Sequence, residues 1–324
     1  MGEKTSRAKL SVALVGVGPT WELHYRDAIQ NLSSKLSVRT VCDSVHMRAA
    51  AVADEYEATA VSCPWLLTQR KDLHAWLILD PVWFDIYPAA LSVRHGCPAL
   101  FANTFSSSIP SLTPILRRSL EQGETLMPEF PQRFMPATTR LRELMATKLG
   151  RVRRIEISIP LSVPDSAAVT RWLHENHAEF IGLLDWCGCL IDDSSSHVTF
   201  RTTSTGSQFD LRFPVRASDP QDVPEVTILF DNSGEFRRHI FCDRGSAVIS
   251  SPTQIAWKTK TEHADESLSH ERSPYEIILD QFCRRALGGL VPVPTLNHAL
   301  QAITTYRLAL QAISEITTRD NNAS

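Results

Sequence analysis

Residues 10–18, LSVALVGVG, decide the fold. The mostly apolar run 10–15 predicts a short strand buried on both faces, as in a parallel sheet. Gly16 and Gly18 follow at once, and residues 21–32 have the spacing of a helix. This order is typical of a dinucleotide-binding unit, in which the first glycine allows the tight turn and the second lets the backbone approach a pyrophosphate.

Asp43 supplies the second part of this fingerprint, because it closes a strand predicted over residues 37–42. An acidic side chain at this point can accept both hydroxyls of the adenosine ribose, which favours NAD over NADP as the cofactor. Trp21 takes the place of the third glycine of the fingerprint. A glycine there lets helix and strand pack closely, so the indole either lines the ligand cleft, the interpretation we favour, or covers the first helix.

Strands and helices alternate through the first part of the chain. The order beyond Asp43 is helix 47–56, strand 75–79, helix 86–94, strand 99–102, helix 109–122 and strand 125–127. Such alternation indicates βαβ units in a doubly wound parallel sheet. We therefore predict an α/β fold with an N-terminal Rossmann domain over residues 1–124.

The remainder, residues 125–324, has a different pattern. Residues 151–160 alternate polar and apolar with period two, so we expect one face of their sheet to be solvated. A single helix is predicted over 174–191, then strands near 198–203, 208–213, 226–230, 235–241, 247–249 and 255–258, and helices over 275–287 and 297–317. The polar segment 261–273 is predicted to be a mobile loop. Runs of strands after one helix indicate an α+β domain with a large open, mostly antiparallel sheet. We expect the last helices to pack back on the first domain.

Composition and charge exclude several classes of partner. Of the 324 residues, 43% are hydrophobic, and 33 Lys and Arg face 36 Asp and Glu, a net charge of −3. This balance lacks the basic footprint that nucleic acids and anionic membranes select, and no stretch reaches the roughly 20 apolar residues of a transmembrane helix. We expect a cytoplasmic protein whose partner is a small-molecule substrate or a second copy of itself. The 7 scattered cysteines predict reduced thiols.

Several segments together resemble the glucose–fructose oxidoreductase / inositol dehydrogenase (Gfo/Idh/MocA) family. They cover nearly the whole chain and are VALVGVGPTWELHYRDAI, VCDSVHMRAAAVADEY, LILDP, QRFMPATTRLRELMATKLGRVRRIEI and SPYEIILDQFCRRALGGLVPVPTLNHALQAITTYRLALQA. The resemblance implies a Rossmann domain, an open-sheet α/β domain, a nicotinamide cofactor, and hydride transfer on a sugar, polyol or similar metabolite. It also implies a homodimer or homotetramer formed through the open sheet.

The same resemblance places Asp80 and Pro81, in the turn after the third predicted strand, on the adenosine side of the cofactor. We expect both residues to contact the cofactor. An anion there meets the pyrophosphate unfavourably unless it hydrogen-bonds to ribose.

The chain departs from the family's pattern at the positions that transfer protons. Where the family commonly has Glu-Lys-Pro, this chain has Ala-Asn-Thr, and Asn103 at the lysine position cannot transfer a proton at neutral pH. Where the family often has His-x-x-x-Asp, Glu179 and Gly182 stand at the best-matching positions, with His177 just before them.

Two interpretations of these departures stay open. In the first, the chain is an NAD(P)-dependent oxidoreductase in which other groups of the cleft move the proton, with His177 as the first candidate and Glu179 as the second. The other groups considered are Asp185, Glu129, Tyr87 and His174. In the second, the chain is a catalytically inactive cofactor- or sugar-binding pseudoenzyme that acts as a sensor or scaffold.

A pure oligomerisation module is a third class, and it would need no pocket at all. His174, His177 and Glu179 form a loose set of metal ligands with no further ligand indicated, so we predict no metal site.

Overall fold

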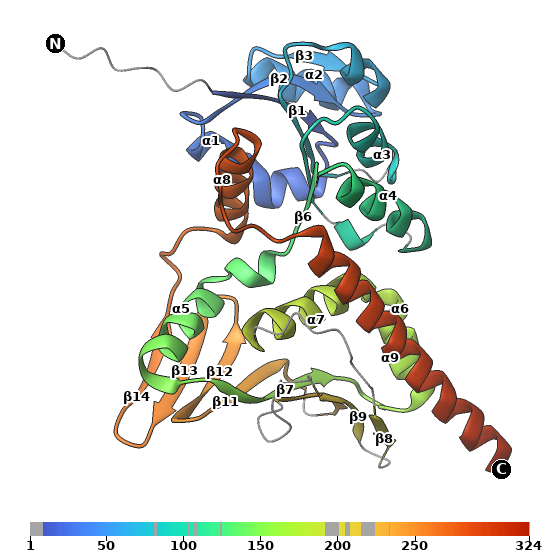
Figure 1. Cartoon of the computed structure of the whole chain (residues 1–324), viewed down its shortest axis with the longest axis vertical. Helices are drawn as coiled ribbons and strands as arrows, with labels where there is room; N and C mark the ends of the chain where they lie inside the picture. Colours follow the sequence, from blue (N-terminus) through green and yellow to red (C-terminus); the bar gives the residue numbers. More distant parts are fainter. Residues whose placement is uncertain are drawn as a thin grey trace. The chain divides into compact units, whose positions relative to one another are not determined.

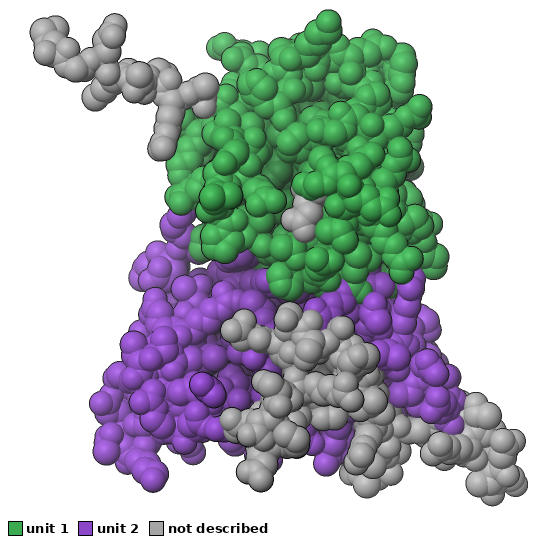
Figure 2. All heavy atoms as spheres, viewed as in Figure 1, with its two compact units in different colours: residues 1–131, 273–300 green, residues 132–272, 301–324 purple. Residues whose placement is uncertain are grey.

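The computed structural model describes residues 9–80, 83–102, 104–106, 109–123, 125–191, 201–204, 208–214, 224–232 and 234–323. The chain divides into two compact units, each assembled from two stretches of sequence. Unit 1 comprises Met1–Pro131 and Ser273–Leu300, and unit 2 comprises Gln132–Arg272 and Gln301–Ser324 (Figure 2). The sequence-based boundary at residue 124 lies shortly before the end of the first stretch of unit 1.

Unit 1 is built around a six-stranded parallel sheet with the order β3-β2-β1-β4-β5-β6 (Figure 1). Its strands are β1 (Leu10–Val15), β2 (Leu36–Cys42), β3 (Thr59–Val61), β4 (Ala75–Ile78), β5 (Ala99–Phe101) and β6 (Leu126–Pro128). The predicted doubly wound parallel sheet is confirmed. The strand order reverses between β1 and β4, and ligands of such sheets bind where the carboxyl ends of these two strands meet.

Helices flank this sheet. They are α1 (Arg26–Asn31), α2 (His46–Glu55), α3 (Tyr87–Arg94), α4 (Ile109–Glu121) and α8 (Pro274–Ala286), with shorter helical turns η1 (Trp21–Tyr25), η2 (Pro64–Gln69) and η3 (Thr104–Ser106). The turn η4 (Pro131–Phe134) begins at the last residue of the first stretch of unit 1 and continues in unit 2. The helix predicted over 21–32 begins as a π-helix, η1, before it becomes α1. Although it is distant in sequence, α8 packs beside α1, where Lys35 forms an ion pair with Asp280 and Asn31 Nδ2 donates to Glu276 Oε2 at 3.2 Å.

Unit 2 contains an eight-stranded sheet with the order β14-β13-β12-β11-β7-β10-β9-β8. Its strands are β7 (Val152–Pro160), β8 (Arg201–Ser204), β9 (Gln208–Pro214), β10 (Glu225–Asp231), β11 (Arg237–Cys242), β12 (Gly245–Ser251), β13 (Gln254–Thr259) and β14 (His263–Ser267). Neighbours are antiparallel except β7 and β10. Ile155, Ile157 and Ile159 of β7 are buried and alternate with more exposed residues. The predicted mostly antiparallel sheet is therefore confirmed.

The helices of unit 2 differ from the prediction in number. They include α5 (Pro136–Leu144), α6 (Ser166–Glu175), α7 (His177–Ile191) and the π-helical turn η5 (Met145–Leu149), and most of α9 (Leu296–Ala323) also belongs to this unit. The helix predicted over 174–191 is present as α7, which begins at His177, whereas α6, which ends at Glu175, has no counterpart in the prediction. The Asn176 side chain donates from Nδ2 to Trp172 O at 2.9 Å, and such a local bond competes with the continuing helix.

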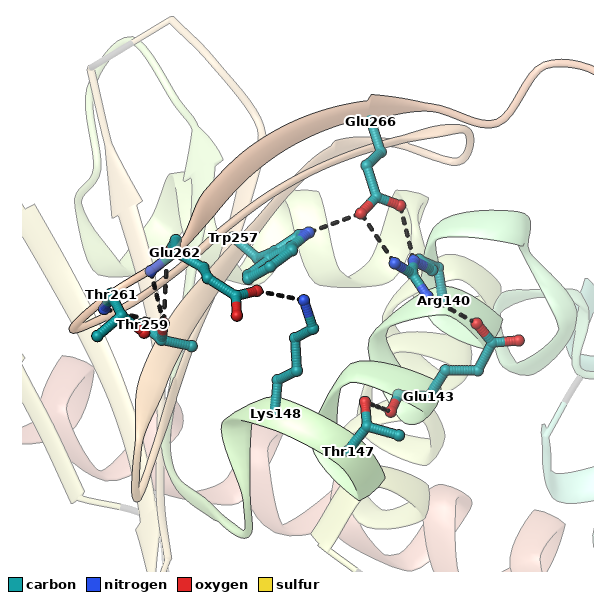
Figure 3. A network of polar contacts seen from close by, with 9 residues as sticks. All are labelled: Arg140, Glu143, Thr147, Lys148, Trp257, Thr259, Thr261, Glu262 and Glu266. Atoms are coloured by element: carbon teal, nitrogen blue, oxygen red, sulfur yellow. Dashed lines mark hydrogen bonds and ion pairs between the residues drawn. The ribbon is translucent and has the colours of Figure 1, made fainter.

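The polar segment 261–273 is not the loop that its composition predicts, because residues 263–267 form strand β14 at the edge of the sheet. The side chain of Glu266 joins this strand to α5 and β13 (Figure 3). Its carboxylate accepts from Arg140 Nε at 2.7 Å and Nη2 at 3.0 Å, and from Trp257 Nε1 at 2.7 Å. Tertiary hydrogen bonds thus hold a strand that has no apolar signal of its own.

Within the described ranges, none of the helices combines the length and the hydrophobicity that are needed to cross a lipid bilayer.

Candidate functional site

The glycine turn after β1 is closely covered by the segment that follows β4. Gly16 has a φ of +77°, and a Cβ atom on it would lie 1.8 Å from the backbone oxygen of Asp80, so only glycine fits. A Cβ atom on Gly18 would lie 2.3 Å from Asp80 Oδ2. The turn is held on its other side by Gly16 N–H, which donates to Cys42 O at 2.8 Å. The glycines therefore stand at the switch point of the sheet, as the sequence predicts.

Asp43 lies at the end of β2, and only 3% of its surface is exposed. Its Oδ2 accepts the backbone N–H of Val17 at 3.0 Å. Its Oδ1 accepts the backbone N–H of Val45 at 2.8 Å and Arg48 Nη2 at 3.1 Å. The carboxylate thus joins the glycine turn to the entry of α2. Two oxygens offer about four acceptor positions in all, so the predicted ribose contact is compatible with these bonds.

Two further predicted cofactor residues, Asp80 and Trp21, differ from each other in exposure. Asp80 is half-buried, with its carboxylate beside Gly18. Trp21 is fully buried and meets the ring of Tyr56 edge-on at 6.1 Å between centroids. The indole Nε1 is buried and has no hydrogen-bond partner within the described residues. Pro81 and Asn103 lie outside the described residues.

A cluster of aromatic and ionisable side chains lies at the base of η1 in unit 1. Tyr25 Oη donates to Glu129 Oε1 at 2.6 Å, and both residues are buried. Burial, with the neighbouring carboxylate, raises the pKa of Tyr25 well above its usual value and that of Tyr275 to about 12. His24 stacks on Tyr275 at 4.1 Å, and burial lowers its pKa. Glu129 is therefore held as a hydrogen-bond acceptor of a phenol.

The predicted proton-transfer residues lie at the start of α7 in unit 2. His177 is half-buried, and its Nδ1 lies 3.0 Å from the carbonyl oxygen of His174. A carbonyl only accepts, so Nδ1 is the donor in this bond, and Nε2 is the ring nitrogen that is left to accept a proton. Glu179 is exposed. Asp185, in contrast, accepts from Arg133 at 2.7 Å (Nε) and 2.6 Å (Nη2) in a buried bidentate pair.

Sequence reasoning missed Arg238 in β11, and the structure places it close to these residues. Only 6% of Arg238 is exposed. Its Nη2 donates to Gln132 Oε1 at 3.0 Å, and Gln132 Nε2 donates to the backbone oxygen of Glu179 at 3.4 Å. The signal was present, because Arg238 shares the period-two register of Ile240, which is fully buried. An arginine on the buried face of a strand is unusual.

The described residues contain no group of three or more His, Cys, Asp or Glu side chains placed to hold a metal ion. Unit 1 therefore brings together Gly16, Gly18, Asp43 and Asp80, and unit 2 brings together Gln132, Glu179 and Arg238.

Comparisons with known proteins identify the fold. No family model matches the sequence, and no curated protein matches it either. Among solved structures, a Gfo/Idh/MocA family oxidoreductase from Vibrio cholerae is similar, with a TM-score of 0.69 and 16% identity over 97% of this chain and 100% of that chain.

UDP-N-acetylglucosamine 3-dehydrogenase from Acidithiobacillus ferrooxidans gives a TM-score of 0.69 at 16% identity, covering 94% of this chain and 99% of that one. A putative NADPH-dependent oxidoreductase from Desulfitobacterium hafniense gives 0.73 at 13% identity, covering 95% and 96%. The two-unit fold of Gfo/Idh/MocA proteins is thus present over 94–97% of the chain, which confirms the fold that the resemblance implied.

Proposed function

We propose that this chain is an NAD(P)-dependent oxidoreductase of the Gfo/Idh/MocA type, which transfers hydride to or from a sugar, polyol or similar small metabolite. The observation that carries the proposal is the glycine turn, which lies at the switch point of a parallel sheet. A Cβ atom at Gly16 would overlap the backbone of Asp80, and one at Gly18 would displace the Asp80 carboxylate. Similarity to solved oxidoreductases over 94–97% of the chain supports it.

The nicotinamide cofactor supplies the hydride when it is bound. Gly16 and Gly18 are the residues whose backbone would approach its pyrophosphate, and Asp43 is the acceptor for its ribose. A carboxylate at Asp43 favours NAD, while Arg48, 3.1 Å from that carboxylate, is the cation that a phosphorylated ribose would need. We propose NAD as the preferred cofactor, because Asp43 is the more buried of the two side chains.

Proton transfer in this proposal belongs to His177 and Glu179. His177 offers Nε2 as a base, because its Nδ1 proton is directed to the carbonyl of His174. Glu179 has an exposed carboxylate in the first turn of α7. Asp185 is excluded from this role by its bidentate pair with Arg133.

A titration of the purified protein with NADH and NADPH, followed by nicotinamide fluorescence, tests the proposal. We expect micromolar binding of NADH, weaker binding of NADPH, and turnover on a panel of sugars and polyols that falls in His177→Ala and Glu179→Gln. Asp54→Asn, an exposed change on α2, is the matched control. Binding of neither cofactor by folded protein would refute the proposal.

The second candidate is a cofactor- or sugar-binding protein without catalysis, favoured by the asparagine that stands at position 103. NADH binding without turnover on the panel would select it.

We also propose that two or four copies associate through the eight-stranded sheet. Arg154, Glu156 and Ser158 of β7 alternate with its buried isoleucines, and Arg154 lies 4.3 Å above the ring of Phe241. Light scattering coupled to size-exclusion chromatography should give a dimer or tetramer, and Arg154→Glu with Phe241→Glu should shift it to the monomer. A monomeric wild-type protein would contradict this proposal.

A further inference from the structure

Arg238 carries a positive charge inside unit 2, and no carboxylate of the described residues forms an ion pair with it. Its Nη2 donates to Gln132 Oε1, a neutral acceptor, at 3.0 Å. Its Nε is buried and has no acceptor within the described residues. The guanidinium stacks over two rings, at 4.8 Å from the centroid of Trp186 and 5.1 Å from that of Phe236. Burial lowers the pKa of Arg238, but an arginine stays protonated in proteins.

The neighbouring acidic groups do not neutralise this charge by contact. Asp185 is engaged by Arg133 in its bidentate pair. Burial raises the pKa of the Cys187 thiol to about 12, so Cys187 is neutral at physiological pH. Glu179 attracts the guanidinium electrostatically, but no hydrogen bond joins the two side chains among the described residues. Burying a charge without a partner is unfavourable, so a chain that retains one has a use for it.

The surroundings of Arg238 indicate what kind of group it binds. Gln132 bridges Arg238 and the backbone of Glu179, and Gly182 leaves room for it, since a Cβ atom there would lie 3.3 Å from Gln132 Nε2. Glu179, Gly182 and Trp186 share one face of α7, because they follow the three- and four-residue spacing of a helix. A planar guanidinium on a flat ring, whose Nε has no acceptor within the described residues, is suited to a carboxylate. The exposed Glu179 carboxylate nearby is suited to a hydroxyl.

We propose that Arg238 binds the carboxylate of a polyhydroxy acid, an aldonate or a uronate, while Glu179 accepts one of its hydroxyls. The substrate class is then a sugar acid rather than a neutral sugar or polyol. That the acid is a substrate rests on the proposed oxidoreductase function, whereas its binding in unit 2 does not.

Calorimetric titration and thermal unfolding of the whole chain test this assignment. The probes are D-gluconate and D-glucuronate, each compared with its neutral counterpart, D-glucitol and D-glucose. Wild-type protein should bind each acid about tenfold or more tightly than its neutral counterpart, the difference expected of one charge-assisted contact. Arg238→Met should abolish this preference. Arg237→Met, an exposed neighbour on the same strand that pairs with Glu235, is the matched control and should retain it.

The ligand-free protein provides a second readout. If Arg238 is kept for ligand binding, Arg238→Met removes an unpaired buried charge and leaves the midpoint of thermal unfolding unchanged or raised. If Arg238→Met does not fold, Arg238→Lys keeps the charge without the planar fork and should reduce the preference for the acids. Equal binding of acid and neutral probe by the wild-type protein, or no binding of either acid, overturns the proposal. A lowered midpoint in Arg238→Met that keeps its acid preference also overturns it.

Titration with NADH separates the two proposals. If the wild-type protein prefers the acids but does not bind NADH, only the oxidoreductase function is refuted. NADH binding without any acid preference refutes the role of Arg238 alone.

Discussion

The backbone N–H of Val17, between the two glycines of the turn, donates to Asp43 Oδ2 at 3.0 Å. The acidic residue at the end of β2 is therefore part of the architecture of the glycine turn before any ligand arrives. This relationship makes the conformation of the turn and the proposed ribose contact depend on one carboxylate.

Replacement of Asp43 by Asn should therefore affect both stability and binding. The amide can accept only through one atom, and it brings an N–H₂ group either against the N–H of Val17 or against the N–H of Val45 and Arg48 Nη2. We expect a loss of about 1–3 kcal/mol in unfolding free energy, measured by urea denaturation, together with weaker binding of NADH. Asp54→Asn is again the control. Unchanged stability with unchanged NADH affinity would contradict the role of Asp43.

Replacement of Asp80 by Asn should strengthen the binding of NADH. The Asp80 carboxylate lies beside Gly18, where a pyrophosphate would add further negative charge. Removing a like charge at such a distance is expected to contribute about 1–2 kcal/mol, or roughly tenfold in the dissociation constant, and less at high salt. Asp72→Asn, which breaks an exposed pair with Arg70, should leave NADH affinity unchanged. Weaker binding in Asp80→Asn would show instead that Asp80 hydrogen-bonds to the cofactor.

The buried pair of Arg133 and Asp185 should respond asymmetrically to single and double changes. Arg133→Met leaves a buried carboxylate without its bidentate partner and should cost about 3–5 kcal/mol in unfolding free energy. The double variant Arg133→Met with Asp185→Leu should recover much of this loss. A double-mutant cycle by chemical denaturation measures the coupling, and the exposed pair Arg70–Asp72 is the comparison, expected at about 0–1 kcal/mol. Additive losses in the buried pair would contradict this prediction.

Glu266 should make the stability of unit 2 depend on pH in the acid range. Hydrogen bonds from Arg140 and then from Trp257 lower the pKa of Glu266, although partial burial opposes them. Because the folded pKa lies below the unfolded one, this contribution is complete above about pH 5 and is lost as the pH falls below about 4. Glu266→Gln should flatten the pH dependence of the unfolding midpoint below about pH 5.

The same variant should also increase hydrogen exchange in residues 263–267, because β14 loses its ties to α5 and β13. Glu262→Gln, which removes only an exposed pair with Lys148, serves as the control. An identical pH profile in Glu266→Gln and the wild-type protein would show that Glu266 does not carry this dependence.

The sequence predicts those elements of the fold whose hydrophobic pattern lies within the element itself. The apolar strand β1 with its glycine turn, and the alternating β7, form where their patterns predict them. The sequence does not predict β14, because its residues are polar and because it is held by Arg140, which lies more than a hundred positions away in sequence. The sequence does not predict β3 either, because a strand of three residues is too short to show an alternation of polar and apolar side chains. The division between α6 and α7 depends on one side chain, Asn176, which bonds to its own helix end.

In the candidate site, too, some placements follow from spacing in the sequence and others depend on tertiary contacts. Spacing alone places Gly16, Gly18 and Asp43 at one edge of the sheet, and the structure brings them there. Spacing does not show that Asp80 closes over the glycines, because this contact joins the ends of two strands that are not consecutive. Nor does it show that Arg238 has no ion pair with a carboxylate of the described residues, since that depends on which side chains of other elements lie beside it.

The two-stretch construction of unit 1 has a consequence for its synthesis. α8 is translated after all of residues 132–272, yet it packs beside α1, near the start of the chain. At roughly 5–20 residues per second, the ribosome needs on the order of ten seconds to pass from one stretch to the other. During that interval the nascent unit 1 lacks a helix, and the surface of α1 that α8 covers is open to chaperones.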